Sequence, residues 1–338
     1  MRPSSRAVAR RDMLKLAGGV ATAGALMGSS GCGLLGGSER AQSSGNGQVE
    51  KPSIKVGALP TAELAPLHYA AQQGLFENEG LDVEIVTASD GATALNNAIG
   101  GDYDITFSSY VPIIAAQAKG VADLKIIADC ASAVPNSCLI MSTPDSGVRS
   151  PTDLAGKRIA ISGTGTISEL MVKASMKANN VPYDQVKWSP LGFANTPKAL
   201  EAGDVDAAML VEPFLTLAAR NAGAVPVLDC ATGPLEDLPL VGYVSNAQFA
   251  QQNPKTIEAF QRAMGKAVSA CQDRSKVEPL LPQFAKIDEQ TASVITLLKM
   301  NNRPDATRLQ RIPRLMLEFN YIDKNIDVAS MIIAPPQS

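Results

Sequence analysis

The sequence predicts an α/β fold with two similar Rossmann-like lobes, each built on a mainly parallel sheet. The order strand, helix, strand, helix, strand, helix occurs twice along the chain, and the motif Gly-Asp-x-Asp-apolar at residues 101–105 returns at residues 203–207. Alternating strands and helices produce parallel sheets whose faces are covered by helices. Because the whole unit is repeated, we expect one lobe from each copy.

The first copy begins with an apolar strand at residues 54–58, and a helix follows at about 65–73. Residues 81–87 alternate between apolar and polar side chains, which is the period of two that is typical of a strand. Asp90 can cap the next helix, which ends at the first repeat motif. The apolar residues after that motif predict the third strand of the copy.

The second copy has the same elements in the same order. A strand at residues 158–161 leads into a loop of glycine and threonine, a helix follows at about 167–179, and a strand lies within 185–191. Pro197 at a first helical position favours the next helix. The second repeat motif then predicts a third strand, as in the first copy.

Two extended segments, residues 122–142 and 224–245, connect the copies. Two such crossings form a two-strand hinge about which lobes can close over a ligand. We therefore expect lobe I at residues 53–132 and 240–338, and lobe II at 133–239. Amphipathic helices are expected to complete lobe I at about 254–272, 289–300 and 306–319.

The first 31 residues have the form of an export signal. Five basic residues accompany an apolar stretch at residues 16–27, which is too short to span a bilayer. The paired arginines of "RRDMLKLAGG" resemble a twin-arginine signal, and "SSGC" resembles a lipoprotein processing site. We expect Cys32 to be lipidated, the alternative being plain cleavage nearby. Residues 32–52 are rich in glycine and serine, as a flexible tether is.

Charge and hydropathy exclude two other classes of partner. Without residues 1–31 the chain carries 25 basic and 32 acidic residues, and it has no run of arginines or lysines. Nucleic-acid binding therefore has no support. No later segment is apolar for about 18 residues, so we expect no transmembrane span, and contact with the membrane only through the lipid anchor.

Four cysteines follow the signal, at Cys130, Cys138, Cys230 and Cys271. An even number outside the cytoplasm is compatible with two disulfides. Cys130 and Cys138 flank a turn-like stretch, and elimination would then pair Cys230 with Cys271; the alternative is four free buried thiols. The spacing indicates no zinc site, and His68 is the only histidine.

Ligands of open parallel sheets bind beyond the carboxyl ends of the strands, where helices begin. The loops at these positions are rich in small hydroxyl and glycine residues, which let a ligand approach the backbone closely. The candidate ligand-binding residues are Thr61, Glu63, Ser89, Ser108, Ser109 and Tyr110 in the first copy, and Thr164, Gly165, Thr166, Asn195 and Glu212 in the second.

Several of these residues have two interpretations. Tyr110 could stack on a ring of the ligand. Glu63 and Glu212 could meet an amine or a base on the ligand, or they could be favourable charges at helix starts. Thr166 also fits a capping box, and Ser89 could likewise serve only as a helix cap.

Four stretches resemble one protein family: "VGALPTAELAPLHYAAQQGLFENEGLDVEIV", "GATALNNAIGGDYDITFSS", "PTDLAGKRIAISGTGT" and "ALEAGDVDAAMLVEPF". They look like the solute-binding proteins of ABC importers of the sulfonate/taurine/nitrate (SsuA-like) type, which share their fold with thiamine-pyrimidine synthases. The resemblance covers about residues 53–330. It implies a type II periplasmic-binding-protein fold in a monomer outside the cytoplasm. Such a protein captures a small solute between its lobes and delivers it to a permease and ATPase complex.

The same fold is compatible with two other functions. A ligand-binding sensor domain would share the cleft without the importer. An enzyme like the fungal thiamine-pyrimidine synthases is not expected, because that family's cysteine-rich iron motif is absent and no Ser-His-Asp set forms around a single histidine. We expect no cofactor and no metal. The solute stays open between a sulfonate or taurine, nitrate, and a thiamine-pyrimidine-like compound.

Overall fold

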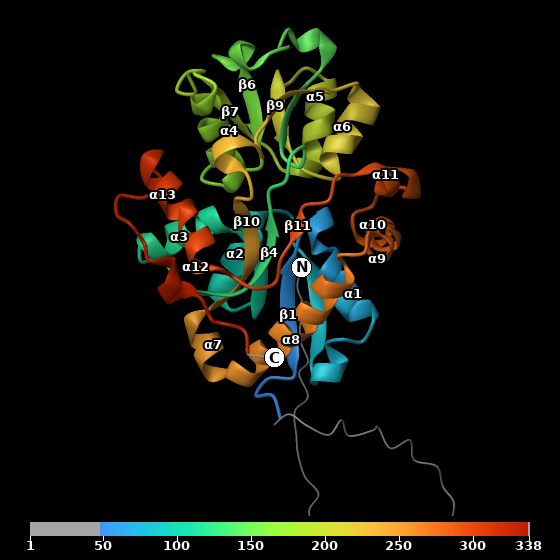
Figure 1. Cartoon of the computed structure of the whole chain (residues 1–338), viewed down its shortest axis with the longest axis vertical. Helices are drawn as coiled ribbons and strands as arrows, with labels where there is room; N and C mark the ends of the chain where they lie inside the picture. Colours follow the sequence, from blue (N-terminus) through green and yellow to red (C-terminus); the bar gives the residue numbers. More distant parts are fainter. Residues whose placement is uncertain (1–47, 337–338) are drawn as a thin grey trace, which may run out of the picture. The chain divides into compact units, whose positions relative to one another are not determined.

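The computed structural model of the chain describes residues 48–336, which belong to one compact unit (Figure 1). The expected export signal at residues 1–31, the lipidation site Cys32 and most of the tether at residues 32–52 lie outside the described residues. Among the residues described, no helix is both long and apolar enough to cross a membrane.

The last residues of the expected tether are bound to the domain. Glu50 Oε2 accepts a hydrogen bond from Thr256 N at 3.1 Å. Lys51 Nζ pairs with Asp104 Oδ1 at 2.7 Å. Within the described part of the chain, the ordered domain thus begins a few residues before the first strand.

The first sheet has six strands, shown in the lower part of Figure 1. Its strands are β1 (Ser53–Ala58), β2 (Asp82–Thr87), β3 (Ile105–Ser109), β4 (Leu124–Ser132), β10 (Pro239–Asn246) and β11 (Lys299–Met300). They lie in the order β11-β4-β10-β3-β1-β2. β1 is parallel to β2 and β3, as the repeated unit predicts, whereas β10 is antiparallel to β3 and β4.

The second sheet repeats this plan with five strands. They are β5 (Leu139–Ser142), β6 (Arg158–Ile161), β7 (Lys187–Pro190), β8 (Ala207–Leu210) and β9 (Val225–Asp229), in the order β7-β6-β8-β5-β9. β6 is parallel to β7 and β8, and β5 is antiparallel to β8 and β9. In each sheet, the strand that enters from the other lobe runs antiparallel between the third and fourth strands of the repeat.

The helices of the two copies cover these sheets. They are α1 (Ala65–Gln72), α2 (Gly91–Gly100) and α3 (Tyr110–Ala118) in the first copy, and α4 (Ile167–Ala178), α5 (Thr196–Glu201) and α6 (Phe214–Ala222) in the second. Those predicted at 65–73 and 167–179 are confirmed by α1 and α4. The main hydrophobic cluster includes Ile54 and Phe107 of the first sheet and Ile159 and Met209 of the second, all at most 2 % exposed.

The repeated Gly-Asp-x-Asp motif has the same structural role in both lobes. Gly101 and Gly203 end α2 and α5 with φ of +86° and +72°, values that glycine adopts without strain. The second aspartate of each copy then bonds the first strand, since Asp104 Oδ2 accepts from Lys55 N at 3.0 Å and Asp206 Oδ2 from Arg158 N at 2.8 Å. The motif thus joins the third strand to the first.

The C-terminal part follows the predicted helices only in places. Its helices are α7 (Ala247–Gln252), α8 (Pro254–Ala270), α9 (Arg274–Val277), α10 (Leu281–Phe284), α11 (Glu289–Val294), α12 (Ala306–Leu309) and α13 (Arg311–Glu318). α8 confirms the helix predicted at 254–272. The helix predicted at 289–300 is wrong beyond Val294, because Lys299 and Met300 form β11 against β4 at the edge of the first sheet.

Two adjacent segments connect the lobes, one from β4 to β5 and one from β9 to β10 (Figure 1). Ala133 N donates to Leu238 O at 2.9 Å, and Cys230 N donates to Cys138 O at 2.8 Å. The two crossings are therefore paired along their length, as a two-strand hinge would be.

The four described cysteines are free thiols, and all are buried. The suggested pairing of Cys130 with Cys138 is not formed, because Cys138 lies opposite Cys230 on the neighbouring hinge segment. Cys271 is buried at the end of α8 in a separate hydrophobic cluster, so it does not pair with Cys230. Of the two interpretations open from the sequence, the structure agrees with four buried thiols.

Candidate functional site

A cavity of about 440 Å³ lies between the two sheets, at the carboxyl ends of strands from both lobes. Lobe I supplies the loop after β1, the start of α2 and the end of β3. Lobe II supplies the loops after β6 and β7 and the end of β8. This is the position at which parallel α/β sheets bind their ligands, and the volume suits a small organic molecule.

Nine of the eleven predicted residues line this cavity. They are Thr61, Glu63, Ser89, Ser108, Ser109, Thr164, Gly165, Thr166 and Asn195. The structure therefore brings together residues that are up to 134 positions apart, from Thr61 to Asn195, because both lobes turn the same ends of their strands toward each other.

Tyr110 does not line the cavity, and the expectation that its ring stacks on a ligand is wrong. Its side chain is fully buried, and its hydroxyl donates to Asp129 Oδ1 at 2.6 Å. Burial and the charge of Asp129 raise the pKa of Tyr110 well above its usual value. The ring points into the sheet because Gly242 of the neighbouring β10 leaves room for it.

Aromatic faces reach the cavity from other residues, which the sequence reasoning missed. Phe107, Phe193 and Phe214 all line it. The rings of Phe193 and Phe214 are 6.0 Å apart and inclined by 17°. Their place in the sequence could have identified them, because they lie close to predicted site residues. Phe107, for example, directly precedes Ser108 in the chain.

Glu212 does not line the cavity either, and its expected contact with the ligand is not supported. Its carboxylate accepts from Thr216 N at 3.1 Å, from Thr216 Oγ1 at 2.9 Å and from Thr296 N at 3.1 Å. Burial raises the pKa of Glu212, although these hydrogen bonds oppose the rise. Glu212 thus links lobe II to the C-terminal segment of lobe I.

Of the two predicted caps, the one at α2 is confirmed and the one at α4 is not formed by the Thr166 side chain. Thr166 does not cap α4 with its side chain; its Oγ1 donates to Gly163 O at 2.7 Å, and the backbone N of Gly165 donates to Glu169 Oε2 at 2.7 Å. At the start of α2 the cap is Asp90, which accepts from Thr93 N at 2.8 Å.

Ser89 supports this cap indirectly. Its hydroxyl donates to Asp90 Oδ2 at 2.8 Å. The Asp90 pKa is lowered by the backbone N–H of Thr93, so Asp90 is ionised at neutral pH. A negative charge therefore already lies at the start of α2.

Glu63 differs from the other acidic residues at the site. It is 6 % exposed and lines the cavity, and no lysine, arginine or histidine among the described lining residues pairs with its carboxylate. Burial raises its pKa to about 7, and the backbone N–H of Glu63 and the nearby Thr61 hydroxyl oppose that rise. Thr61 Oγ1 is itself buried without a hydrogen-bond partner among the described residues.

The charge of the cavity is acidic. Glu63 and Asp90 are the charged residues among those that line it, and the described lining contains no lysine, arginine or histidine. In the described part of the chain, no group of three or more histidine, cysteine or acidic side chains could hold a metal ion.

Solved structures have the same architecture. The alkanesulfonate-binding protein SsuA from Xanthomonas axonopodis pv. citri, bound to MOPS, superposes with a TM-score of 0.73 at 20% identity, over 84% of this chain and 99% of that chain. The nitrate-binding protein NrtA from Synechocystis PCC 6803 gives a TM-score of 0.74 at 14% identity, over 84% and 87%. The two lobes thus have the periplasmic-binding-protein fold that the sequence predicted.

The family follows from the sequence match. Residues 61–276 match the family described as NMT1/THI5 like, and the chain belongs to that family. A candidate aliphatic sulfonates-binding protein of Bacillus subtilis (strain 168) is 24% identical, over 80% of this chain and 82% of that protein. A formylaminopyrimidine-binding protein of Halalkalibacterium halodurans is 23% identical, over 75% and 79%.

One relative is an enzyme. The 4-amino-5-hydroxymethyl-2-methylpyrimidine phosphate synthase of Aspergillus parasiticus is 26% identical, over 60% of this chain and 61% of that protein. The match with it is shorter than the matches with the two binding proteins.

Proposed function

We propose that this protein is the solute-binding component of an ABC importer. It captures a small solute between its lobes and delivers it to a membrane permease and ATPase complex. The observation that carries this proposal is the cavity at the carboxyl ends of both sheets, lined by both lobes and adjacent to a paired hinge. Ligand binding in such a cleft favours the conformation in which both lobes contact the solute.

A binding role is favoured over catalysis by the residues that line the cavity. Cys138 is the one described thiol there, and burial raises its pKa, so it stays protonated at neutral pH. No histidine among the described lining residues can act as a base for it. The lining is mostly hydroxyls and apolar side chains, which bind rather than react.

We further propose that the protein works outside the cytoplasm as a lipoprotein anchored through Cys32. Fatty-acid labelling of cells that express the full chain tests this. The chain should carry the label, and Cys32→Ser should remove it. Labelling that persists in Cys32→Ser, or that never appears in the wild type, would exclude the anchor without affecting the binding function.

Thermal denaturation of the exported protein with a panel of solutes tests the binding function. The panel contains taurine, alkanesulfonates, nitrate, the thiamine pyrimidine, amino acids and nucleobases. A ligand at about 100 times its dissociation constant should stabilise the protein by about 2.7 kcal/mol. Loss of uptake of the same solute, in cells that lack the chain, separates an importer component from a sensor domain.

A further inference from the structure

We propose that the cavity selects a largely apolar solute that donates N–H hydrogen bonds and carries no anionic group, and that Glu63 is the residue that receives the donor. This inference rests on the function proposed above, and it narrows the ligand of that same site. Two independent features of the cavity support it: a nearly buried carboxyl group without a cationic partner among the described residues, and the absence of basic side chains from the described lining.

The first feature is the Glu63 carboxyl group, which is almost completely buried and faces the cavity. A buried carboxyl group without hydrogen bonds is costly, and folded proteins normally give such groups a partner. In the described part of the chain, the donors near the Glu63 carboxylate are its own backbone N–H and the Thr61 hydroxyl, and the lining supplies no cation. A ligand with an amino, amidine or ammonium group would supply further donors, with charge-assisted hydrogen bonds if Glu63 is ionised.

The second feature is the charge around the cavity. A sulfonate or a nitrate is usually held by basic side chains or by the N–H groups at helix starts. The described lining has no basic side chain. At the start of α2 Asp90 already occupies Thr93 N, and at the start of α4 Glu169 already occupies Gly165 N. An anion would therefore meet the Asp90 carboxylate at the start of α2, and it would find Gly165 N already bonded at the start of α4.

The apolar residues that line the cavity indicate the shape and polarity of the rest of the solute. Phe107, Phe193 and Phe214 present aromatic rings, and Met171 and Met209 present flexible apolar side chains. Such a surface suits a planar ring or a short alkyl group rather than a strongly hydrated molecule. The ligand class is accordingly an amino-substituted heterocycle or an apolar amine.

Matched probes of similar size separate the alternatives. The exported protein is titrated by calorimetry with 4-aminopyrimidine, benzylamine, benzenesulfonate and nitrate, at pH 8, where Glu63 is ionised. We expect 4-aminopyrimidine or benzylamine to bind and the two anions not to bind. A preference between the first two distinguishes a heterocycle from an amine.

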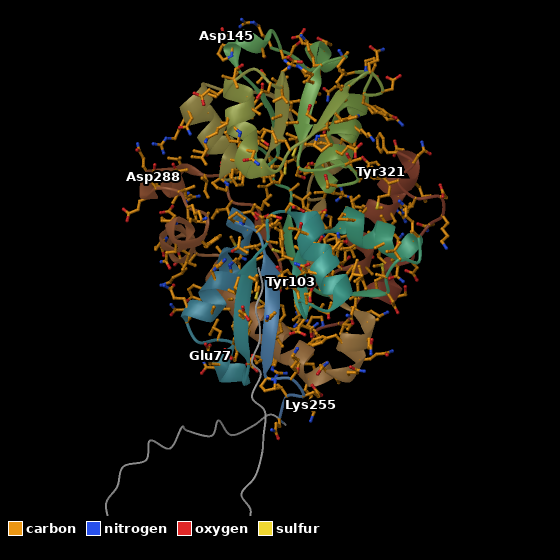
Figure 2. The ribbon with its side chains drawn as sticks, turned by 180° about the vertical axis from the view of Figure 1, so that it is seen from behind. Glu77, Tyr103, Asp145, Lys255, Asp288 and Tyr321 are labelled. Atoms are coloured by element: carbon orange, nitrogen blue, oxygen red, sulfur yellow. The ribbon has the colours of Figure 1, made fainter. Side chains whose placement is uncertain are left out.

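Glu63→Gln should weaken binding of the amino probe by about tenfold to a hundredfold, because it removes a charge-assisted hydrogen bond. The matched control is Glu77→Gln, an exposed glutamate at the end of lobe I that is remote from lobe II (Figure 2). It should leave the affinity unchanged. Binding of an anion, or an affinity for the amino probe that Glu63→Gln leaves unchanged, would overturn the inference but not the proposed function.

Mass spectrometry of small molecules released from the protein after purification completes the test. A released solute with an N–H donor and no anionic group supports the inference, and a released sulfonate or carboxylate overturns it. A protein that binds no probe, responds to no solute of the wider panel and releases nothing would contradict the proposed function itself, and the inference with it.

Discussion

The two lobes place a glutamate shortly after their first strand, and they use it in opposite ways. In lobe II, Glu169 Oε2 accepts from Gly165 N at 2.7 Å and Oε1 pairs with Lys173 Nζ at 2.7 Å. In lobe I, Glu63 lies in the short 3-10 helix Ala62–Leu64 after β1, and no described lysine or arginine pairs with its carboxylate. One carboxylate holds its own loop in place and has a counter-ion, whereas the other faces the cavity without one.

The difference between the two glutamates can be traced to the residue that stands four positions later in the chain. Lys173 follows Glu169 at that spacing, and its ammonium also lies 4.7 Å from the ring centroid of Tyr321. At the same spacing from Glu63 stands Leu67, which is fully buried. Glu169 and Lys173 are neighbours because they are four apart on α4, whereas Glu63 lies in the short 3-10 helix before α1 and has an apolar residue at that spacing. Lobe II therefore contains a built-in counter-ion at this place and lobe I does not.

The largest expected effect on stability comes from replacing Glu169, the glutamate that is paired with a lysine. Glu169→Gln should lower the free energy of unfolding by about 3 kcal/mol, because it leaves a mostly buried lysine without its charge partner. Glu63→Gln should not lower it. Urea denaturation of both variants at pH 8 measures the contrast, with Glu77→Gln as the surface control. Equal losses for Glu169→Gln and Glu63→Gln would mean that both glutamates are structural.

The second prediction concerns pH. The folded pKa of Glu63 is about 7 and therefore lies above its unfolded value of 4.5, so the folded state holds the proton more tightly. The stability that this proton provides is complete below pH 4.5 and is lost as the pH rises to 7. The wild type should thus lose about 2 to 3 kcal/mol relative to Glu63→Gln over this window.

The difference in stability between the wild type and Glu63→Gln reports the titration of Glu63 alone, because the neighbouring groups behave alike in both proteins. Burial raises the pKa of Cys130, Cys138 and Tyr243, so these groups stay neutral through the window. Asp129 has a pKa raised to about 6 by burial and titrates in both proteins alike. Asp90 has a lowered pKa and loses its proton below this range, again in both. Parallel stability curves for wild type and Glu63→Gln would show that Glu63 has an ordinary pKa.

Glu212 extends the comparison to a second glutamate of lobe II. Glu212→Ala should lower the free energy of unfolding by about 2 kcal/mol, because it leaves the partly buried N–H groups of Thr216 and Thr296 unpaired. Glu212→Ala should leave ligand affinity unchanged, since Glu212 does not line the cavity. Glu201→Ala, at an exposed position at the end of α5, is the control and should change neither the affinity nor the free energy of unfolding. A loss of affinity without a loss of stability would return Glu212 to the binding site.

Local patterns predicted the repeat and the place of most candidate residues on the cavity, because these features depend on neighbours in the chain. The strands, the capped helices and the loops at the strand ends follow from period, turn residues and the βαβ rules, and these place nine of the eleven candidate residues on the cavity. The prediction for Tyr110 was wrong because the direction of its side chain depends on Gly242. That glycine lies 132 positions away, on strand β10, which enters from the other lobe.

The other errors have the same origin. Glu212 finds its partner Thr296 in the C-terminal segment, and Cys138 faces Cys230 across the hinge. Lys299 and Met300 become strand β11 because β4 offers them an open edge. Each of these outcomes is decided by a contact between distant parts of the chain, which local periodicity does not encode.

The smallest expected effect concerns a feature that the lobes share. Asp104→Ala and Asp206→Ala should each lower the free energy of unfolding by about 1 kcal/mol, because each removes the acceptor for a backbone N–H of the first strand. Asp104→Ala should cost more, since its side chain is 9 % exposed and that of Asp206 is 20 % exposed.

The double variant of Asp104 and Asp206 tests whether the two lobes unfold together or separately. The two aspartates lie in different sheets and have no common partner, so their effects on the free energy of unfolding should add. Urea denaturation of the two single variants and the double variant measures this. A double variant less destabilised than the sum would indicate that one lobe can unfold before the other. The hinge would then be a boundary between two folding units as well as the connection between the lobes.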